Sequence, residues 1–373
     1  MYGRLDRNRH GLQCQGISFN CPLQKSCSEA YSDSERSLDR FPIQEQMDTG
    51  QPPLRICVGV ITRNRPEMFV MLLDSLRDMT GISKYEITFA LVENNPRSTL
   101  SKVVEDFKRE TQHSTTVYEV EERIGIPIAR NRILRIAKRF DTDLVAFIDD
   151  DETVDRHWLQ NFVTEMLDRD LDLVGGPVRL HPVEPGASAT QRAIWRGLVR
   201  RNQRIERKAS ALQRAGRDDV VTIITSNWLC KREFLDDSGV RFDEGLGFSG
   251  GSDTSFYRSA RARGARTGWV SGAVVHEFMP LSRLNARYQF CRTRDQAMAS
   301  FHRKYKRITP TVVARSVGFF VVKAVAGVGL LLVAPLNGGR TLTAAIRSFG
   351  FAVGRVRAVF GQRSEHYKST HGH

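Results

Sequence analysis

Four consecutive acidic residues follow an apolar run in the middle of the chain: Asp149, Asp150, Asp151 and Glu152. The run, residues 144–148, is short and rich in β-favouring side chains, which predicts a buried strand of a parallel sheet. Its carboxyl end would lie at the edge where open α/β sheets bind ligands. Because neighbouring carboxylates repel one another unless a cation or hydrogen-bond donors offset them, the acids predict a positive partner there.

A structural interpretation of the same acids is also open. Acidic residues after a strand are typical of a solvated loop, and Asp155, ahead of His157 and Trp158, is suited to cap the helix that follows. The acidic run alone does not decide between a ligand site and a capping loop.

Three further polar groups are expected at the same edge of the sheet. They are residues 62–65 after a predicted strand at 55–62, residues 93–94 after a strand at 87–92, and residues 130–131 at a helix start. Together they offer donors and acceptors for a base and a ribose. Asp149 and Asp151 have a D-x-D spacing, and hard cations such as Mg²⁺ or Mn²⁺ take one or two carboxylates plus substrate phosphates. The set predicts a nucleotide site with a divalent cation.

The composition limits the class of protein. With 373 residues and 40% apolar content, the chain can hold one large α/β domain with additions. Its net charge of +14 and pI near 9.8 predict an acidic partner: nucleic acid, nucleotide phosphates or an anionic membrane surface. The six cysteines are scattered without a close Cys-x-x-Cys pair, which disfavours a zinc site and suits a reducing compartment.

The first 52 residues are polar and aperiodic, which predicts a disordered leader. They contain no apolar signal segment, so the active region is expected to face the cytoplasm. Met47 lies just before the first predicted strand, and a start codon assigned too far upstream would also explain the leader.

Strands and helices alternate through most of the chain, which predicts a doubly wound, mostly parallel α/β sheet. Further strands are expected at 115–119, at 171–180 with a break at Gly175-Gly176-Pro177, at 220–228 and at 267–275. Helices are expected at 66–79, 131–140, 156–169 and 253–263, and at 98–111 with Ser98 or Thr99 as its cap. The arginine-rich residues 185–217 predict a mobile, basic loop-and-helix insertion.

The C-terminal part is first basic and then apolar. Residues 284–310 predict a basic helix, and residues 317–336 are apolar apart from Lys323. A spanning helix needs roughly 20 apolar residues, a length that this segment reaches only by including Lys323. We therefore expect the helices of residues 311–363 to lie in or dip into the cytoplasmic leaflet, with arginines meeting lipid headgroups. A hairpin that spans the bilayer is the alternative.

Residues 54–305 resemble the family 2 glycosyltransferases, which have the GT-A fold. The resemblance rests on motifs at residues 60–65, 91–95, 125–131, 147–152, 175–178 and 250–253. Within the family, the chain is similar to bacterial enzymes that add glucose to lipid-linked exopolysaccharide repeat units of the succinoglycan type. The resemblance implies a GT-A domain at 53–283, with a nucleotide-sugar half at 53–180 and an acceptor half at 181–283.

The resemblance also implies roles by position. The nucleotide sugar would be held by a group of six residues: Thr62, Asn64, Glu93, Arg130, Asp149 and Asp150. Asp151 would be the main ligand of Mg²⁺ or Mn²⁺, with Asp149 and His276 as further candidates. Asp253 would be the catalytic base, which takes the proton of an acceptor hydroxyl as that oxygen attacks the anomeric carbon. The metal would neutralise charge on the departing diphosphate.

The implied enzyme is inverting and metal-dependent. It would move glucose from UDP-glucose, a UDP-sugar, to a lipid-linked oligosaccharide at the cytoplasmic face of the bacterial inner membrane. Its positive charge would then meet an anionic membrane surface rather than nucleic acid.

Several residues of the expected site carry more than one interpretation. Gly250 and Gly251 would let the backbone approach a sugar, or would form a flexible turn. Ser252 stands where the family usually has Glu, and Arg292, in a weak match to a Gln-x-x-Arg-Trp motif that lacks its Trp, would contact phosphate or belong to a basic helix. Asp253 is also a suitable helix N-cap, and His276 is equally suited to a buried, hydrogen-bonded position.

Other functional classes remain open at this point. A degenerate family member that binds nucleotide or polysaccharide without catalysis would be consistent with Ser252. A nucleic-acid binder is disfavoured because the chain has no helix-turn-helix, zinc or RNP-like pattern. A nucleotidyltransferase would usually carry a glycine-rich loop after the first strand, and residues 62–66 contain no glycine.

Overall fold

The computed structural model describes residues 52–246, 251–305 and 307–362. Nearly all of the predicted leader lies outside these ranges. The first half of the described chain alternates strands and helices: β1 (Leu54–Thr62), α1 (Pro66–Arg77), β2 (Tyr85–Glu93), α2 (Ser101–Glu110), β3 (Thr115–Val120), α3 (Ile126–Arg139) and β4 (Leu144–Asp149).

The second half contains shorter strands and longer helices. In chain order these are β5 (Glu152–Val154), α4 (Trp158–Asp168), β6 (Leu173–Gly175), β7 (Val178–Leu180), α5 (Ala189–Arg214), η2 (Asp218–Val220), β8 (Asn227–Lys231), α6 (Arg232–Ser238), η3 (Glu244–Leu246), α7 (Ser252–Ala262), β9 (Thr267–Trp269) and β10 (Val275–Glu277). The C-terminal elements are η4 (Leu281–Arg283), α8 (Ala286–Lys304), α9 (Pro310–Val333), η5 (Pro335–Asn337) and α10 (Leu342–Val359).

A seven-stranded sheet forms the centre of the domain, with the order β3-β2-β1-β4-β8-β6-β9. Its strands run parallel except β8, which is antiparallel to both β4 and β6. A second sheet has the order β5-β10-β7. The predicted doubly wound, mostly parallel sheet is confirmed, and it is a GT-A-like fold.

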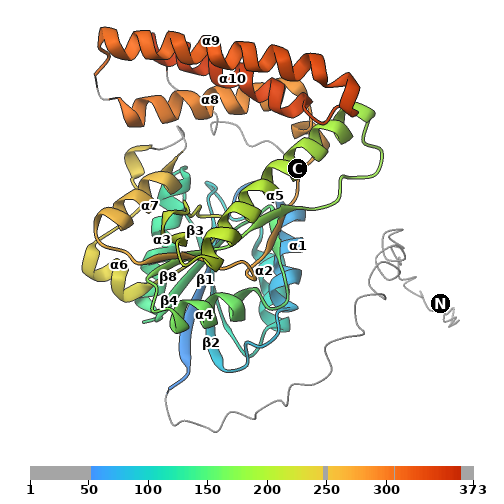
Figure 1. Cartoon of the computed structure of the whole chain (residues 1–373). Coiled ribbons are helices and arrows are strands. Elements are labelled where there is room, and N and C mark those ends of the chain that lie inside the picture. The colour runs from blue at the N-terminus through green and yellow to red at the C-terminus, as the bar shows by residue number, and fades with distance from the viewer. Residues whose placement is uncertain (1–51, 247–250, 306, 363–373) are drawn as a thin grey trace, which may run out of the picture. The chain divides into compact units, whose positions relative to one another are not determined.

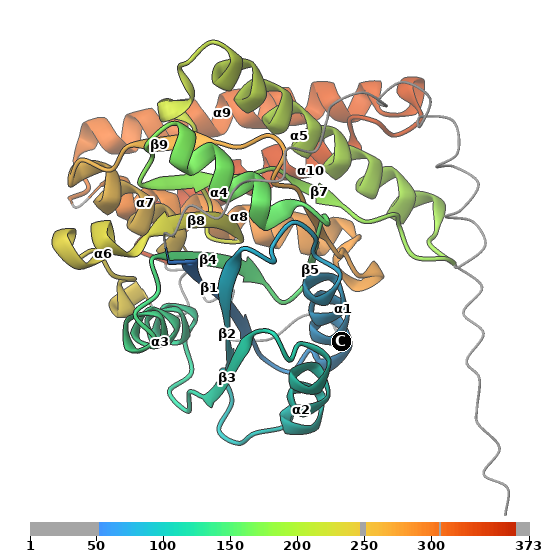
Figure 2. The same ribbon diagram turned by 90° about the horizontal axis from the view of Figure 1, so that it is seen from below.

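Helices cover both faces of the large sheet because its strand side chains alternate between two apolar layers. Val58 and Val60 of β1 pack in a cluster with Phe69 of α1, whereas Cys57 packs with Ile133 of α3. Accordingly, α1 and α2 lie on the opposite side of the sheet from α3 (Figure 2). Burial on both faces holds β1, β2 and β4 in fixed register, so their carboxyl ends form one edge.

Three predicted strands have different bounds in the structure. β8 begins at Asn227 rather than at residue 220, and the segment predicted as one strand at 267–275 is divided into β9 and β10. The strand predicted at 171–180 is divided into β6 and β7 at its predicted break, and it begins at Leu173. Asn227 explains the divisions, because its Nδ2 donates to the carbonyl oxygens of Pro177 (3.0 Å) and Ala273 (2.8 Å). A side chain thus pairs backbone groups that a continuous ladder would otherwise satisfy.

The segment predicted as a loop-and-helix insertion forms one long helix, α5, of 26 residues. Ser188 and Gln191 form a capping box at its start, which satisfies two backbone N–H groups of the first turn. Ile194 and Leu198 on one face of α5 are buried in a cluster that includes Leu284 and, from α10, Leu342. The arginine-rich segment therefore has its own apolar face.

The three C-terminal helices α8, α9 and α10 pack side by side (Figure 1). The guanidinium of Arg355 on α10 lies 5.1 Å from the ring of Phe301 on α8 and 5.3 Å from the ring of Phe319 on α9. Thr343 of α10 donates a 3.0 Å hydrogen bond to the carbonyl oxygen of Ile194. α10 therefore connects the C-terminal helices to α5 of the α/β domain.

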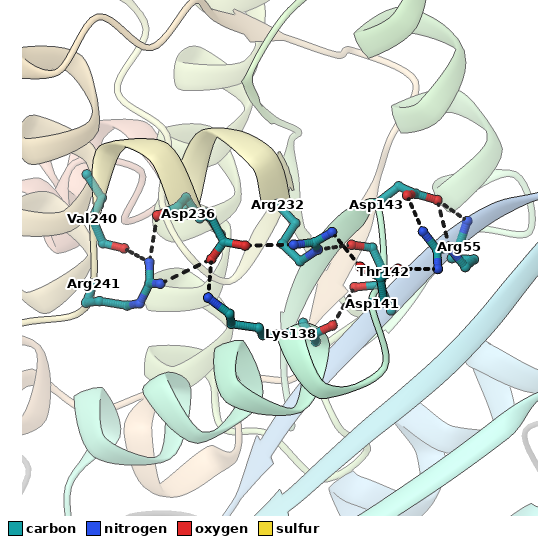
Figure 3. Close-up of polar contacts among 11 residues, drawn as sticks. Arg55, Lys138, Asp141, Thr142, Asp143, Arg232, Asp236, Val240 and Arg241 are labelled. Carbon is teal, nitrogen blue, oxygen red and sulfur yellow. Dashed lines mark hydrogen bonds and ion pairs between the residues drawn. The ribbon is translucent and has the colours of Figure 1, made fainter.

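A network of ion pairs joins β1, α3 and α6 where β1 and β4 begin, at the edge away from their carboxyl ends (Figure 3). Arg55 pairs with Asp141 at 2.7 Å and Asp143 at 3.0 Å, and Arg232 pairs with Asp141 at 2.9 Å and Asp236 at 2.7 Å. These side chains are partly exposed, so each pair contributes modestly to stability. The network connects these elements at the edge of the sheet that carries none of the predicted site residues.

The contact between α10 and α8 depends on small residues, and Gly354 gives the sharpest test of it. A Cβ at Gly354 would lie 2.2 Å from the carbonyl oxygen of Arg294, whereas a Cβ at Gly329 on α9 meets nothing within 4 Å. We expect Gly354→Ala to lower the free energy of unfolding by about 1–3 kcal/mol through overpacking. Gly329→Ala, the matched control, should leave it unchanged or raise it by up to about 1 kcal/mol through helix propensity. Urea unfolding measures both, and equal effects of the two substitutions would contradict this packing.

Candidate active site

The carboxyl ends of three adjacent strands bring the predicted polar groups together. Thr62 pairs in register with Glu93, and Ile61 pairs with Asp149, so the ends of β1, β2 and β4 are level with one another. Thr62 is buried, and its carbonyl oxygen accepts a 2.9 Å hydrogen bond from the backbone N–H of Asn94. The expectation that these loops share one edge is confirmed.

Arginines from distant parts of the chain face the acidic run. Nη1 of Arg65 lies 2.8 Å from Asp150 and 3.1 Å from Asp151, and Nη1 of Arg283 lies 3.1 Å from Asp151. Burial nevertheless raises the pKa of Asp150 to about 6 against the opposing effect of Arg65. The guanidinium groups of these arginines thus supply part of the positive charge that the acidic run predicts.

The carboxylates that no lysine or arginine fully balances have raised pKa values. Burial raises the pKa of Asp149, and repulsion by Asp151 adds to it while Arg130 opposes it. Burial, Asp149 and Asp151 raise the pKa of Glu152 well above its usual range. The site therefore concentrates more negative charge than its described arginines neutralise.

Arg130 of α3 joins the acidic run to the start of α7. Its guanidinium is 4% exposed, lies 3.1 Å from Asp149, and also binds Asp253 at 2.5 Å. The same group lies 5.5 Å from the centre of the Phe242 ring. Asp149 and Asp253, which are more than 100 positions apart in sequence, are therefore held on either side of one buried cation.

Asp253 is not the N-cap of α7. The helix begins at Ser252, and its N-cap is Gly251 in the left-handed region with φ 86°, so the capping interpretation of Asp253 is wrong. The hydroxyl of Ser252 donates to Asp253 at 3.1 Å. The left-handed backbone of Gly251 explains glycine at this position. Gly250 lies outside the described residues.

Glu93 is completely buried, and both of its carboxylate oxygens accept hydrogen bonds. The donors are Asn95, Tyr118 and both the backbone N–H and the hydroxyl of Thr99. Burial alone would raise the pKa of Glu93, but these hydrogen bonds outweigh it and lower the pKa. In this structure Glu93 holds the loop between β2 and α2 rather than facing an opening.

The loops beside Glu93 differ from the expectation in two further ways. Neither Ser98 nor Thr99 caps α2, whose N-cap is Leu100, because the Thr99 hydroxyl is bound to Glu93. Asn64 is exposed and has φ 53°, a left-handed conformation that Asn adopts more readily than most residues.

His276 does not join the acidic run, contrary to the expectation for a metal ligand. Its Nε2 lies 3.0 Å from Asp155, and this contact also explains why Asp155 is not the cap of α4. Alternation along β10 is the reason, because His276 pairs with Thr153 whereas Glu277 pairs with Glu152. Glu277 is thus the residue of β10 that faces the acids, and alternation alone could not identify it, because the sequence does not show which residue of β10 pairs with Glu152.

A cavity of about 590 Å³ opens over the acids. Asp149, Asp151 and Asp253 line it together with Trp269 and, from α8, Arg292. Other lining residues come from α5, from residues 222–226 and from Gly176, so both predicted halves and the basic helix form its wall. The sequence placed Arg65 at this edge within residues 62–65, but it did not indicate Arg283, Trp269 or the α5 residues, because no local pattern connects them to this edge.

Comparison with known proteins agrees with this geometry. The family described as Glycosyl transferase family 2 matches residues 57–239. The succinoglycan biosynthesis protein ExoM of Rhizobium meliloti (strain 1021) is 30% identical over 232 residues, which cover 62% of this chain and 69% of ExoM. The chain belongs to glycosyltransferase family 2 and is an enzyme of that family.

Solved structures of S. aureus TarS are also similar. TarS 1–349 is 14% identical, with a TM-score of 0.45 over 83% of this chain and 92% of that one. A longer TarS chain is 15% identical with a TM-score of 0.42, and the match covers 64% of this chain and 39% of that one.

Arg130 tests the electrostatics of the site. We expect Arg130→Met to lower the free energy of unfolding by about 3 kcal/mol or more, because it leaves Asp149 and Asp253 without their shared buried cation. Arg130→Lys keeps the charge and should cost less. Arg135→Met removes an exposed arginine of the same helix and serves as the control. If urea unfolding gave equal losses for Arg130→Met and Arg135→Met, the bridging role of Arg130 would be disproved.

Proposed function

We propose that the protein is an inverting, metal-dependent glycosyltransferase that moves glucose from UDP-glucose to a lipid-linked oligosaccharide during exopolysaccharide biosynthesis. The observation that carries the proposal is the placement of Asp149, Asp151 and Asp253 on one cavity, with Asp253 bound to both Arg130 and Ser252. Family membership supports glycosyl transfer, and the name of ExoM supports a polysaccharide pathway.

The donor set suits Mg²⁺ or Mn²⁺. Asp149 and Asp151 supply hard oxygen ligands, and the raised pKa of Asp149 and Glu152 reflects a negative charge that a divalent cation would relieve. Within the ranges that the structure describes, no group of three or more His, Cys, Asp or Glu has the spacing of a metal site. A bound ion would therefore take one or two carboxylates and complete its shell with donor phosphates and water. When bound, it would stabilise negative charge on the departing diphosphate.

Asp253 is the proposed general base. It would accept the proton of an acceptor hydroxyl while that oxygen forms a bond to the anomeric carbon and the bond from this carbon to the diphosphate breaks. Arg130 and Ser252 position the carboxylate, and Ser252 supplies a hydrogen bond at the place where the family usually has Glu. A single displacement turns an α-linked donor into a β-glycoside.

Thr62, Asn64 and the loop that Glu93 holds are proposed to bind the nucleoside, with Asp150 and Arg130 close to the nucleotide. Because Glu93 is buried, its proposed contribution is to shape the loop of residues 94–99. Gly251 and Ser252 lie beside the cavity on the acceptor side.

The apolar helix α9 supports the proposal of a membrane location. Of the helices in the described ranges, only α9 is long and apolar enough to cross a membrane: its most apolar 18-residue window has a mean hydropathy of 2.2 and is 11% buried. Val317, Val321, Val325 and Leu332 are exposed along it. Because α9 packs on α10, which carries several arginines, we propose that the helices lie in the cytoplasmic leaflet of the bacterial inner membrane.

Two carboxylate substitutions test the chemistry. We expect Asp151→Asn to abolish transfer and metal-dependent binding of UDP-glucose, and Asp253→Asn to abolish transfer while donor binding stays within about threefold, because a base acts only on the acceptor. Asp155→Asn is the control, since Asp155 binds His276 outside the acidic run. Donor binding is measured by calorimetry with Mn²⁺ and then with EDTA. Full transfer by Asp151→Asn would contradict the proposed mechanism.

A matched pair of substitutions tests the membrane face. Val325 on α9 is 67% exposed and Leu167 on α4 is 52% exposed. We expect Val325→Glu to reduce partitioning onto anionic vesicles by about tenfold, because the burial of one aliphatic side chain contributes about 1.5 kcal/mol. Leu167→Glu should have no effect. Vesicle flotation measures both, and an equal loss for the two substitutions would argue against α9 as the membrane face.

A further inference from the structure

Three arginines from three different helices converge beside the cavity. Arg201 of α5 and Arg292 of α8 line it, and Arg347 comes from α10. Arg201 and Arg347 belong to segments that the sequence did not connect with the site.

The position of Arg347 follows from the packing of α10. Thr343, Arg347, Gly350 and Gly354 recur every three or four residues, so they share one face of the helix. Thr343 binds the carbonyl oxygen of Ile194 on α5, and a Cβ at Gly350 would lie 2.7 Å from the carbonyl oxygen of Phe290 on α8. Arg347 lies between these two contacts and therefore extends from α10 toward the place where α5 and α8 meet.

The positions on α5 and α8 agree with this convergence. Arg201 lies on the face of α5 that also carries Ile194 and Leu198, both buried. Arg292 adjoins Thr293, which is completely buried on α8. Glu277 of β10 interacts with both Arg201 and Arg292 and is the carboxylate of this group. Two of the three guanidinium groups thus interact with the carboxylate of Glu277.

Like charges beside one another affect the pKa of two arginines of the cluster. Burial lowers the pKa of Arg347 to about 10, with further lowering by Arg201 and Arg292. Partial loss of hydration and the charge of Arg292 also lower the pKa of Arg201, although this residue is exposed at the surface. An anion bound among the three guanidinium groups would relieve the repulsion between them. Burial would strengthen the charge-assisted hydrogen bonds from the guanidinium groups to that anion.

We propose that Arg201, Arg292 and Arg347 bind a phosphate or diphosphate group of the lipid-linked acceptor. The proposal rests on the proposed function, and it adds a second phosphate site to the one expected for the donor at Asp149 and Asp151. We favour a lipid as the source of this phosphate group because Arg347 belongs to α10, which packs on the apolar and exposed helix α9. Arg201 and Arg292 line the cavity, and Arg347 belongs to α10, which packs on α9. The charged head of a lipid-linked sugar would enter the cavity beside these arginines.

The first experiment uses the full chain and inorganic pyrophosphate, titrated by calorimetry in EDTA so that metal-mediated binding at the acids does not contribute. We expect the wild-type chain to bind pyrophosphate and Arg347→Gln to bind it about tenfold more weakly, the effect of losing one charge-assisted contact. Arg347→Lys should retain affinity within about threefold. Arg357→Gln, which removes an exposed arginine of the same helix, is the control and should bind as the wild type does. Equal affinity of wild type and Arg347→Gln would overturn the proposal.

Two further measurements distinguish the possible causes of weaker pyrophosphate binding by Arg347→Gln. The thermal unfolding midpoint of Arg347→Gln should stay equal or rise, because the substitution relieves repulsion among like charges; a fall would assign Arg347 a structural role and overturn the proposal. The affinity for UDP with Mn²⁺ should be unchanged, and an equal tenfold loss would assign the cluster to the donor instead. If wild-type chain bound no UDP, the proposed donor would be wrong, while the pyrophosphate comparison would still decide the role of the three arginines.

Discussion

Repulsion among buried carboxylates at the end of β4 is the constraint on which the rest of the structure depends. Asp150, Asp151 and Glu152 are buried and Asp149 is partly buried, and repulsion among these adjacent acids contributes to the raised pKa values of Asp149, Asp150 and Glu152. Arginines from the N-terminus of α1, from α3 and from η4 form ion pairs with these acids. Segments from residue 65 to residue 283 must therefore pack around the end of β4 to offset the repulsion among the acids. The remaining negative charge suits a site that binds a cation together with its substrate.

The sequence predicted the parts of this arrangement that have a local signal. The apolar runs of β1, β2 and β4 and the polar residues after each of them determined the position of the edge, because strand pairing aligns carboxyl ends. The ion pairs of Asp151 with Arg65 and Arg283 span 86 and 132 positions and leave no periodic trace, so they could not be predicted. The error at His276 had a different cause. Only pairing with β5 determines which face of β10 meets the acids, and that pairing joins residues about 120 positions apart.

Ser252 shows how the site can accommodate a departure from the family pattern. A glutamate at this position would bring a further carboxylate next to Arg130, which already serves Asp149 and Asp253. The serine hydroxyl instead donates to Asp253 and adds no charge, so Arg130 remains shared between two acids. Orientation of the proposed base is therefore preserved through a neutral hydrogen bond, and the loss of the acid is not by itself a sign of decay.

The close packing of α10 explains how a C-terminal helix can take part in the chemistry of a sheet edge more than 190 positions away. Gly350 and Gly354 let the backbones of α10 and α8 approach until a Cβ has no room, and Thr343 fixes α10 on α5. Arg347 lies between these contacts, so its guanidinium has little freedom to withdraw from the like charges beside it. A flexible surface arginine would turn toward water and relieve the repulsion. Holding it in place costs stability, and a structure retains such a cost where an anionic ligand offsets it.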